Sequence, residues 1–193
     1  MAKALVELLE REFGEAILET HAQHGDETVV VAPDRWLTIA RFLRDDPRTD
    51  MKMLVDLTAV DWLDREPRFD VVAHFLSLNF GHRLRMKTRT GDEDGEHAEV
   101  DSLTELWASA NWMERECYDL FGVTFRGHPD LRRILLYPEF VGHPLRKDYP
   151  ADKIQPLVPF READNIEKLP PFGPDEGMSF GRQTHARSSE DES

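Results

Sequence analysis

The residue types that could perform chemistry concentrate in residues 112–150. This stretch holds six acidic and six basic side chains and is therefore neutral, whereas the whole chain has a formal net charge of −14 at pH 7. Carboxylate and imidazole groups can bind a metal ion that activates water. The stretch supplies both kinds of group in Glu116, Asp119, His128 and Asp130. A small stand-alone metal-dependent hydrolase is therefore one hypothesis for the function of the chain.

The histidines of this stretch have a simpler explanation. His128 and His143 each lie between a glycine and a proline, an arrangement typical of tight turns. They do not form a pair at ligand spacing on one helix or hairpin, and the chain has a single cysteine, Cys117. An iron–sulfur cluster needs about four ligands, usually cysteines. We therefore expect no metal ion or cluster in this chain.

Motifs for nucleotide-dependent catalysis are absent from the sequence. It contains no glycine-rich phosphate loop and no G-x-G-x-x-G after a predicted strand. Cys117 falls on the apolar side of a predicted helix, where a cysteine is usually an unreactive core residue. We therefore expect no site for NADH or flavin in this chain, and no catalytic residue.

The acidic composition excludes several classes of partner. A chain of 193 residues, 40% of them hydrophobic, is long enough for one domain with a core and an extension. Its negative charge argues against binding to nucleic acid or to an anionic membrane surface. No apolar run approaches the roughly 20 residues that span a bilayer, and the N-terminus lacks the apolar core of a secretory signal. We expect a location in the cytoplasm or on the cytoplasmic face of a membrane.

The predicted elements follow the order helix, strand, helix and then a run of strands. Apolar residues at helical spacing predict helices over residues 2–19 and 33–45, and a polar turn is expected at residues 21–26. β-Branched or alternating residues predict strands over residues 28–32, 53–59, 69–78 and 83–90. The last two are joined by a short connection and should pair as a hairpin. The fold class is therefore α+β, with N-terminal helices packed on a mainly antiparallel sheet, followed by a helix and an extended C-terminal arm.

A third helix is predicted over residues 103–121. Ser102 and Glu105 have the spacing of a capping box, which marks a helix start, although a break near residues 109–111 is an alternative. Gly122 suits the left-handed position that ends a helix. Apolar residues form a stripe along one side of this helix, namely Leu103, Leu106, Trp107, Ala110, Met113, Cys117, Leu120 and Phe121.

Glu114 lies within this apolar stripe. It could be a functional carboxylate with a raised pKa. It could also be a buried carboxylate paired with Arg132 or Arg133, which is favoured because a buried unpaired charge costs several kcal/mol. The opposite, charged side of the helix carries Trp112, Glu116, Arg115 and Asp119. The last two lie one turn apart and should form a weak surface ion pair.

The composition changes after residue 150. Six of the twelve prolines lie in residues 150–193, where helical or alternating patterns are scarce. We therefore predict one α+β domain over residues 1–150 and an extended proline-rich arm over residues 151–193 with a disordered end. An arm with few core residues gains order only by lying on something else, so we expect it to lie across partner proteins.

Two parts of the chemistry-bearing stretch resemble one known family. Residues 114–135, ERECYDLFGVTFRGHPDLRRIL, resemble the signature of the C subunit, the 30 kDa subunit family, of proton-translocating NADH–quinone oxidoreductase, respiratory complex I. Residues 142–150, GHPLRKDYP, resemble the segment that follows it in that family. The matching positions are Glu114, Arg115, Glu116, Asp119, Phe121, Gly122, His128, Pro129, Asp130, Leu131, Arg132, Arg133, Leu135, Asp148, Tyr149 and Pro150.

The resemblance implies a role inside a larger assembly. The C subunit of that family lies in the hydrophilic arm of the complex, on the cytoplasmic side of the bacterial cell membrane. It packs against the D subunit, which carries the quinone site, and lies near the B subunit, which carries the terminal iron–sulfur cluster. It holds no redox centre; flavin and iron–sulfur clusters in partner subunits pass electrons from NADH to quinone, coupled to proton translocation. Membrane-bound hydrogenase-type complexes contain a similar subunit and are an alternative.

The resemblance implies that the matching residues serve contacts between subunits. Arginine forks bind carboxylates and aromatic residues anchor interfaces, and the stretch is rich in both. No residue is expected to be catalytic or to bind a cofactor or metal. The residues expected at the subunit interface are Glu114, Arg115, Glu116, Tyr118, Asp119, Phe121, Gly122, His128, Pro129, Asp130, Arg132, Arg133, Asp148 and Tyr149.

Overall fold

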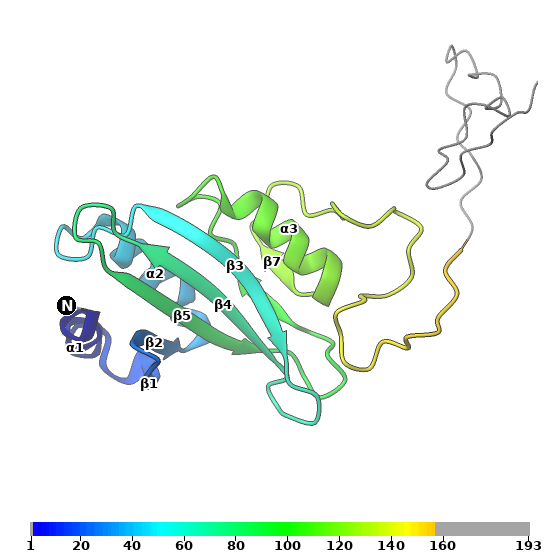
Figure 1. The fold of residues 1–193 in the computed structure, drawn as a ribbon, viewed down its shortest axis with the longest axis horizontal. Coiled ribbons are helices and arrows are strands. Elements are labelled where there is room, and N and C mark those ends of the chain that lie inside the picture. The colour runs from blue at the N-terminus through cyan, green and yellow to red at the C-terminus, as the bar shows by residue number, and fades with distance from the viewer. Residues whose placement is uncertain (1, 157–193) are drawn as a thin grey trace, which may run out of the picture. The chain divides into compact units, whose positions relative to one another are not determined.

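The computed structural model describes residues 2–156, and these residues have the α+β fold class that the sequence predicts (Figure 1). Of the arm predicted over residues 151–193, the part beyond residue 156 lies outside the described residues. In chain order the elements are α1 (Ala2–Phe13), η1 (Gly14–Ala16), β1 (Ile17–Gln23), β2 (Asp26–Val31), η2 (Pro33–Arg35), α2 (Trp36–Asp45), β3 (Met53–Asp61), β4 (Phe69–Leu76), β5 (Arg83–Thr90), β6 (Glu99–Asp101), α3 (Ala110–Phe121) and β7 (Thr124–Arg126).

Within these residues, five strands form a mixed sheet in the order β1-β2-β5-β4-β3. Neighbouring strands run antiparallel except β2 and β5, which are parallel. The predicted hairpin is confirmed, because β4 and β5 pair from Phe69 opposite Thr90 to Leu76 opposite Arg83. Parallel neighbours need a crossover, and here α2, β3 and β4 supply it.

The helices of this domain share a hydrophobic core with one face of the sheet. α2 turns Trp36, Ile39, Ala40 and Leu43 into this core at helical spacing, and all four are buried. Figure 1 shows α2 behind the sheet and α3 beside β3. Cys117 of α3 is buried in the same core, and burial raises the pKa of its thiol. The prediction that this cysteine is a core residue is confirmed.

The first helix is shorter than predicted. The helix expected over residues 2–19 ends at Phe13, and Gly14 follows with a φ of +49°. Glycine adopts this left-handed conformation readily, and it ends the helix. The chain then enters β1, an edge strand with mainly exposed residues that lacks apolar alternation. The turn expected at residues 21–26 therefore shrinks to residues 24–25 between β1 and β2.

The third helix begins at the alternative position near residues 109–111 and not at the predicted capping box. It starts at Ala110 rather than directly after Ser102, and it ends as predicted at Gly122, whose φ is +79°. The Ser102 hydroxyl donates to the Glu114 carboxylate at 2.7 Å and accepts the Thr104 N–H at 3.1 Å. The capping-box prediction is wrong because this serine serves a local turn and a tertiary contact instead.

Two short strands bracket α3. β6 and β7 pair in parallel, with Val100 opposite Phe125, and both of these side chains are buried. This pairing was not predicted from the sequence. Residues 127–156, named here the post-β7 segment, form neither helix nor strand. Within the described part of the chain, every helix is too short or too polar to cross a membrane.

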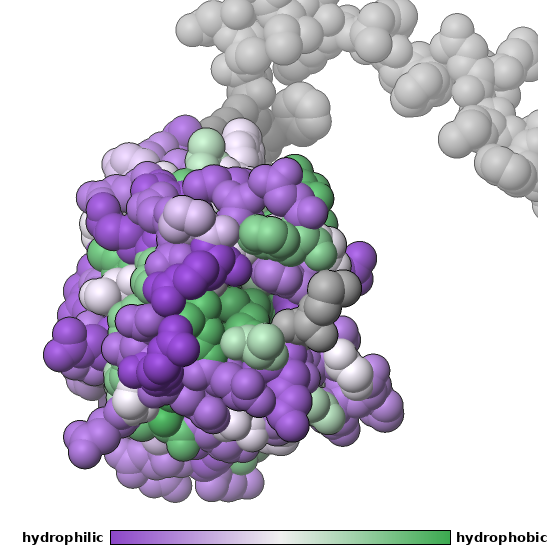
Figure 2. Space-filling view, turned by 90° about the vertical axis from the view of Figure 1, so that its left-hand side faces the viewer, coloured by the Kyte–Doolittle hydropathy of each residue, from purple (hydrophilic) through white to green (hydrophobic). Residues whose placement is uncertain are grey.

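The end of the sheet beside α1 is mainly hydrophilic. Figure 2 shows this side of the molecule, where a hydrophobic area lies among hydrophilic residues. Leu5 and Leu8 of α1 and Arg48 line a hollow here. The β4–β5 turn exposes Leu78 and Phe80. Single apolar residues exposed in a turn, such as these two, are normal on a protein surface.

Candidate functional site

Asp119 is a buried centre that holds the start of the post-β7 segment. Its Oδ1 accepts a hydrogen bond from Arg133 Nη1 at 2.7 Å. Its Oδ2 accepts the backbone N–H groups of Ile134, Leu135 and Leu136 at 3.0, 2.8 and 2.8 Å. Burial acts to raise the pKa of Asp119, but these donors outweigh it and hold the pKa below its ordinary value. The ionised carboxylate therefore fixes four consecutive residues.

Arg133 and His143 extend this arrangement to the next turn. Arg133 Nη2 donates to the Gly142 carbonyl at 3.0 Å, and its guanidinium lies 5.8 Å from the centre of the Phe140 ring. His143 Nδ1 lies 2.9 Å from the Asp119 carbonyl oxygen. Burial lowers the pKa of His143, so the neutral imidazole donates its Nδ1 proton to this carbonyl. The C-terminal half of α3 is thus bonded to residues 133–143.

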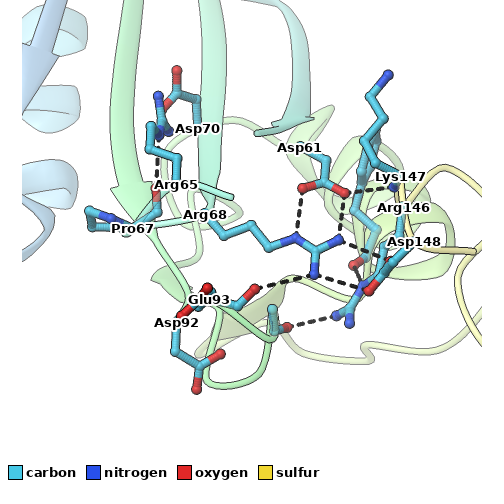
Figure 3. Close-up of polar contacts among 12 residues, drawn as sticks. Asp61, Arg65, Pro67, Arg68, Asp70, Asp92, Glu93, Arg146, Lys147 and Asp148 are labelled. Carbon is cyan, nitrogen blue, oxygen red and sulfur yellow. Dashed lines mark hydrogen bonds and ion pairs between the residues drawn. The ribbon is translucent and has the colours of Figure 1, made fainter. Parts of the chain in front are cut away.

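A second buried centre forms around Arg68 (Figure 3). Its Nε and Nη2 donate to the two carboxylate oxygens of Asp61 at 2.7 and 2.8 Å. Its Nη1 and Nη2 lie 3.1 and 2.9 Å from the carboxylate of Asp148. Asp61 also accepts the Lys147 N–H at 2.8 Å. Burial acts to raise the pKa of Asp61, but Arg68 and this N–H lower it. One guanidinium, placed directly before β4, therefore joins the end of β3 to the end of residues 112–150, which are named here the family-like stretch.

Arg146 ties the same region to α3 and to the loop before β6. Its Nε donates to the Phe121 carbonyl at 2.6 Å and its Nη2 to the Gly95 carbonyl at 2.9 Å. The guanidinium groups of Arg68 and Arg146 lie 5.3 and 5.4 Å from the centre of the Phe69 ring. Cation–π contacts of this kind strengthen when they are shielded from water. Arg146 therefore links three separate parts of the domain.

Glu114 is fully buried and has no basic partner in residues 2–156. Its Oε1 accepts the Leu103 N–H at 2.6 Å and its Oε2 accepts the Ser102 hydroxyl at 2.7 Å. The predicted pairing with Arg132 or Arg133 is wrong, because both arginines bind other acids. Burial raises the pKa of Glu114 to about 7, although the two hydrogen bonds oppose this shift. The carboxyl group is therefore partly protonated near neutral pH.

Arg115 does not form the ion pair that helical spacing predicts. Its Nε and Nη2 donate to the carbonyl oxygens of Arg132 and Arg133 at 3.1 and 3.2 Å. Its guanidinium lies 5.4 Å from the centre of the Trp112 ring, whose side chain is exposed. Asp119 was expected on the same solvent-facing side but is buried. The prediction failed because the post-β7 segment folds over that side of α3.

The structure divides the predicted interface residues by their exposure. Three are buried within the chain, namely Glu114, Asp119 and Phe121. Six are partly buried, namely Arg115, Tyr118, Gly122, His128, Arg133 and Tyr149. Five are exposed, namely Glu116, Pro129, Asp130, Arg132 and Asp148. The same stretch also exposes apolar side chains, namely Trp112, Leu135, Val141 and Leu145.

The geometry gives no support to the hydrolase hypothesis. The Asp119 carboxylate is already engaged by four donors. His128 Nε2 lies 3.1 Å from the Asn111 carbonyl oxygen, and its Nδ1 accepts the Asp130 N–H at 3.0 Å. Among the described residues, no group of three or more histidine, cysteine or acidic side chains could hold a metal ion.

Comparison with known proteins places the chain in a family. Residues 29–155 match the family described as respiratory-chain NADH dehydrogenase, 30 Kd subunit. The chain belongs to this 30 kDa subunit family. The match begins within β2 and runs through β7 and nearly all of the post-β7 segment, so it covers both buried centres.

Similar proteins of the 30 kDa family come from several bacteria. The C subunit of NADH-quinone oxidoreductase from Citrifermentans bemidjiense is 46% identical over 148 residues, which cover 77% of this chain and 88% of that protein. The protein of the same name from Roseiflexus castenholzii is 44% identical over 158 residues, covering 82% of this chain and 88% of that protein.

The fold also occurs in a solved respiratory complex. A chain in the structure of the membrane-bound sulfane sulfur reductase, an archaeal respiratory membrane complex, superposes with a TM-score of 0.64. It is 24% identical, and the match covers 78% of this chain and 86% of that chain. This likeness shows a shared fold.

Sequence analysis missed Asp61 and Arg68, although one signal was available. Leu57, Ala59 and Asp61 alternate along β3 and share its core-facing side. A carboxylate at such a position requires a buried base. Arg68 directly precedes β4 across the turn, so the pair could have been inferred. The contacts with residues 147–148 could not, because they join positions about 80 residues apart.

Proposed function

We propose that this chain is a non-redox, structural subunit of an NADH–quinone oxidoreductase. The whole complex transfers electrons from NADH to quinone, coupled to proton translocation. Membership of the 30 kDa family and relatives named as the C subunit of that enzyme support this proposal. The observation that carries it is how the family-like stretch uses its charged groups. The buried carboxylates bind backbone N–H groups and arginines of the same chain. These contacts stabilise its conformation, and they leave these carboxylates no free position for a substrate.

In this proposal the partners are other subunits of the complex, chiefly the D and B subunits. The chain lies in the peripheral arm, on the cytoplasmic side of the bacterial cell membrane. It contributes no flavin, metal ion or iron–sulfur cluster, and those groups belong to its partners. Its role is to hold neighbouring subunits in the geometry that electron transfer to quinone requires.

The buried and exposed members of the family-like stretch have different roles in this proposal. Asp119, Arg133 and Glu114 shape the surface from within. Glu116, Arg132 and the exposed apolar residues of the same stretch contact partners. An apolar centre with an arginine near it is a common composition for an interface. A surface that is already shaped loses less conformational entropy on binding.

Co-purification tests the proposed function. A tag on the full chain is used to isolate its complex from detergent-solubilised membranes, and the partners are identified by mass spectrometry. We expect NADH-binding, quinone-site and iron–sulfur subunits, with flavin and iron absent from this chain after the subunits are separated. Hydrogenase subunits in place of NADH-binding ones, or a lone chain with a bound metal, would contradict the proposal.

A matched pair of arginine variants tests the assignment of the surface. Arg132 is exposed and paired with Asp130 at 2.9 Å, and Arg11 on α1 is exposed and paired with Glu12 at 3.3 Å. We expect Arg132→Ala to lower the recovered complex several-fold and Arg11→Ala to leave it unchanged, because only Arg132 belongs to the family-like stretch. Equal recovery of both variants would contradict the placement of the interface.

A further inference from the structure

The end of β3 and the turn that follows it expose a second group of apolar side chains outside the family-like stretch. Val60, Trp62 and Leu63 are 39, 47 and 44% exposed, and they are nearly consecutive in the chain. Figure 1 shows this turn at the end of the sheet opposite to the β4–β5 turn. Residues 62–66 are named here the Trp62 loop.

The indole of Trp62 is held in place by its own chain. Its Nε1 donates to Asp70 Oδ2 at 3.0 Å, and the Arg65 guanidinium lies 5.3 Å from the centre of the Trp62 ring. Arg65 is itself fixed, because it donates to the other oxygen of Asp70 and to the Pro67 carbonyl. Figure 3 shows Arg65 together with Asp70 and Pro67. A fixed aromatic ring loses little entropy when a partner covers it.

The exposed charge of the Trp62 loop is acidic. Asp64 and Glu66 are exposed, and neither pairs with a base among residues 2–156. Arg65 does not neutralise them, because its guanidinium is paired with Asp70. A partner that covers the indole would therefore gain from placing a basic residue beside it.

The Trp62 loop lies in the chain between Asp61 and Arg68, two members of the second buried centre. Asp61, which precedes the loop, accepts the Lys147 N–H, and Arg68, which follows it, binds Asp148. The loop and residues 147–148 are therefore neighbours. A partner bound to the end of the family-like stretch can reach the loop without a second, separate contact area.

We infer that the Trp62 loop is a docking point for a partner protein segment that presents an apolar side chain next to a lysine or arginine. The exposed apolar side chains and the fixed ring call for an apolar side chain in the partner, and the unpaired acids call for a basic one. The adjoining family-like stretch indicates that the segment belongs to a protein bound there. Tryptophan and arginine are the residue types that most often carry binding energy in interfaces. The inference rests on the proposed function in one respect, since the segment belongs to another protein of the same complex.

Site-specific photo-crosslinking in the assembled complex tests this inference. Leu63 is replaced by benzoylphenylalanine in the full chain, the complex is irradiated, and the cross-linked peptides are sequenced. Phe80 is the matched control, because it is 47% exposed against 44% for Leu63 but lies in the β4–β5 turn. We expect a cross-link from position 63 to a partner peptide with a basic residue near the linked position, and none of that kind from position 80. Cross-links only within this chain, to a second copy of it, or none at all would overturn the inference.

Two further variants measure how much the Trp62 loop contributes. We expect Trp62→Ala to lower the fraction of chain found in the complex about tenfold or more, as hot-spot truncations do. Asp64→Asn combined with Glu66→Gln removes both charges and should lower that fraction several-fold. The melting temperature of the full chain should stay unchanged, because asparagine also adopts the left-handed conformation of Asp64, whose φ is +65°. Phe80→Ala is the control for both. Equal effects of Trp62→Ala and Phe80→Ala would overturn the inference.

The outcomes separate this inference from the proposed function. If the wild-type chain does not co-purify with an NADH–quinone oxidoreductase, the proposed function fails. If it co-purifies and position 63 forms no cross-link to a partner, only the role of the Trp62 loop fails.

Discussion

The sheet and the post-β7 segment are stabilised by different means. In the sheet, backbone ladders join five strands, and one face is sealed by a hydrophobic core. The post-β7 segment has no strand pairing, and carboxylates accept hydrogen bonds from its backbone instead. Asp119 accepts three backbone N–H groups of this segment and Asp61 accepts a fourth. Arg133 and Arg146 bond backbone carbonyls in the same way.

This difference determines how each region fails. A sheet shares its stability over many backbone bonds and apolar contacts, so the loss of one contact is diluted. The segment depends on a few charged atoms, each of which holds several backbone groups. Loss of Asp119 would therefore release a run of residues while the sheet persists. The surface that we propose for partners should therefore be disrupted by substitutions that leave the fold intact.

The largest effect is expected at Arg68, which serves both regions. Arg68→Met leaves Asp61 buried and without its cation, and breaking a buried ion pair in this way costs about 3–5 kcal/mol. Asp148→Asn is the control within the same centre, because the Asp148 side chain is 47% exposed and should cost less than about 1 kcal/mol. Urea unfolding of the full chain measures both. Similar losses for the two variants would contradict the central position of Arg68.

Asp119→Asn should act mainly on the post-β7 segment. An amide cannot accept from Arg133 and from three backbone N–H groups at once, so buried donors lose their partners at about 1–3 kcal/mol. Hydrogen exchange should become fast at residues 134–136 and stay slow in β4 and β5. Fast exchange in both places would show that the two regions are not separable.

Glu114→Gln should remove a dependence of stability on pH. The pKa of Glu114 is raised from about 4.5 to about 7 by burial, so the folded chain holds a proton that the unfolded chain releases between these values. The wild-type free energy of unfolding should therefore fall as pH rises from about 4.5 to 7, by up to about 3 kcal/mol, and this contribution should be constant above pH 7.

The glutamine variant isolates this contribution from those of histidines. Burial lowers the pKa of His74 and His143, which makes stability rise with pH in an overlapping range. The quantity to measure is therefore the difference in unfolding free energy between wild type and Glu114→Gln at pH 5 and at pH 7.5. A difference that does not change with pH would contradict the raised pKa.

The smallest effect on stability is expected at Arg132. Its ion pair with Asp130 is solvent-exposed, and such pairs contribute about 0–1 kcal/mol. Arg132→Ala should therefore shift the unfolding free energy of the full chain by less than about 0.5 kcal/mol while lowering recovery of the complex. A larger loss of stability would show that Arg132 belongs to the folded segment rather than to its surface.

The sequence predicted correctly those elements whose position depends on neighbouring residues alone. The alternation of apolar and polar residues predicted the correct bounds of β5. The end of α3 at Gly122 was also predicted correctly, because this prediction needs only the preference of glycine for a left-handed backbone. β1 was missed because an edge strand has little apolar alternation. Glu114 was correctly placed on the buried side of α3, but its partners were not predicted, because Ser102 and Leu103 approach through tertiary folding.

The division of the candidate site into a buried frame and an outer surface could not be predicted from the sequence. Asp119 and Glu116 are both charged residues on the expected solvent side of α3. Only the path of the post-β7 segment decides that Asp119 is buried and Glu116 is exposed. That path depends on contacts such as Arg68 with Asp148, which join residues 80 positions apart.

The measurement to make first is hydrogen exchange at the amides of residues 134–136 in the isolated full chain. If Asp119 shapes the proposed partner surface, these three amides exchange slowly before any partner is present and fast in Asp119→Asn. Fast exchange in the isolated wild-type chain, with protection only in the assembled complex, would show that the partner shapes the segment and that Asp119 does not.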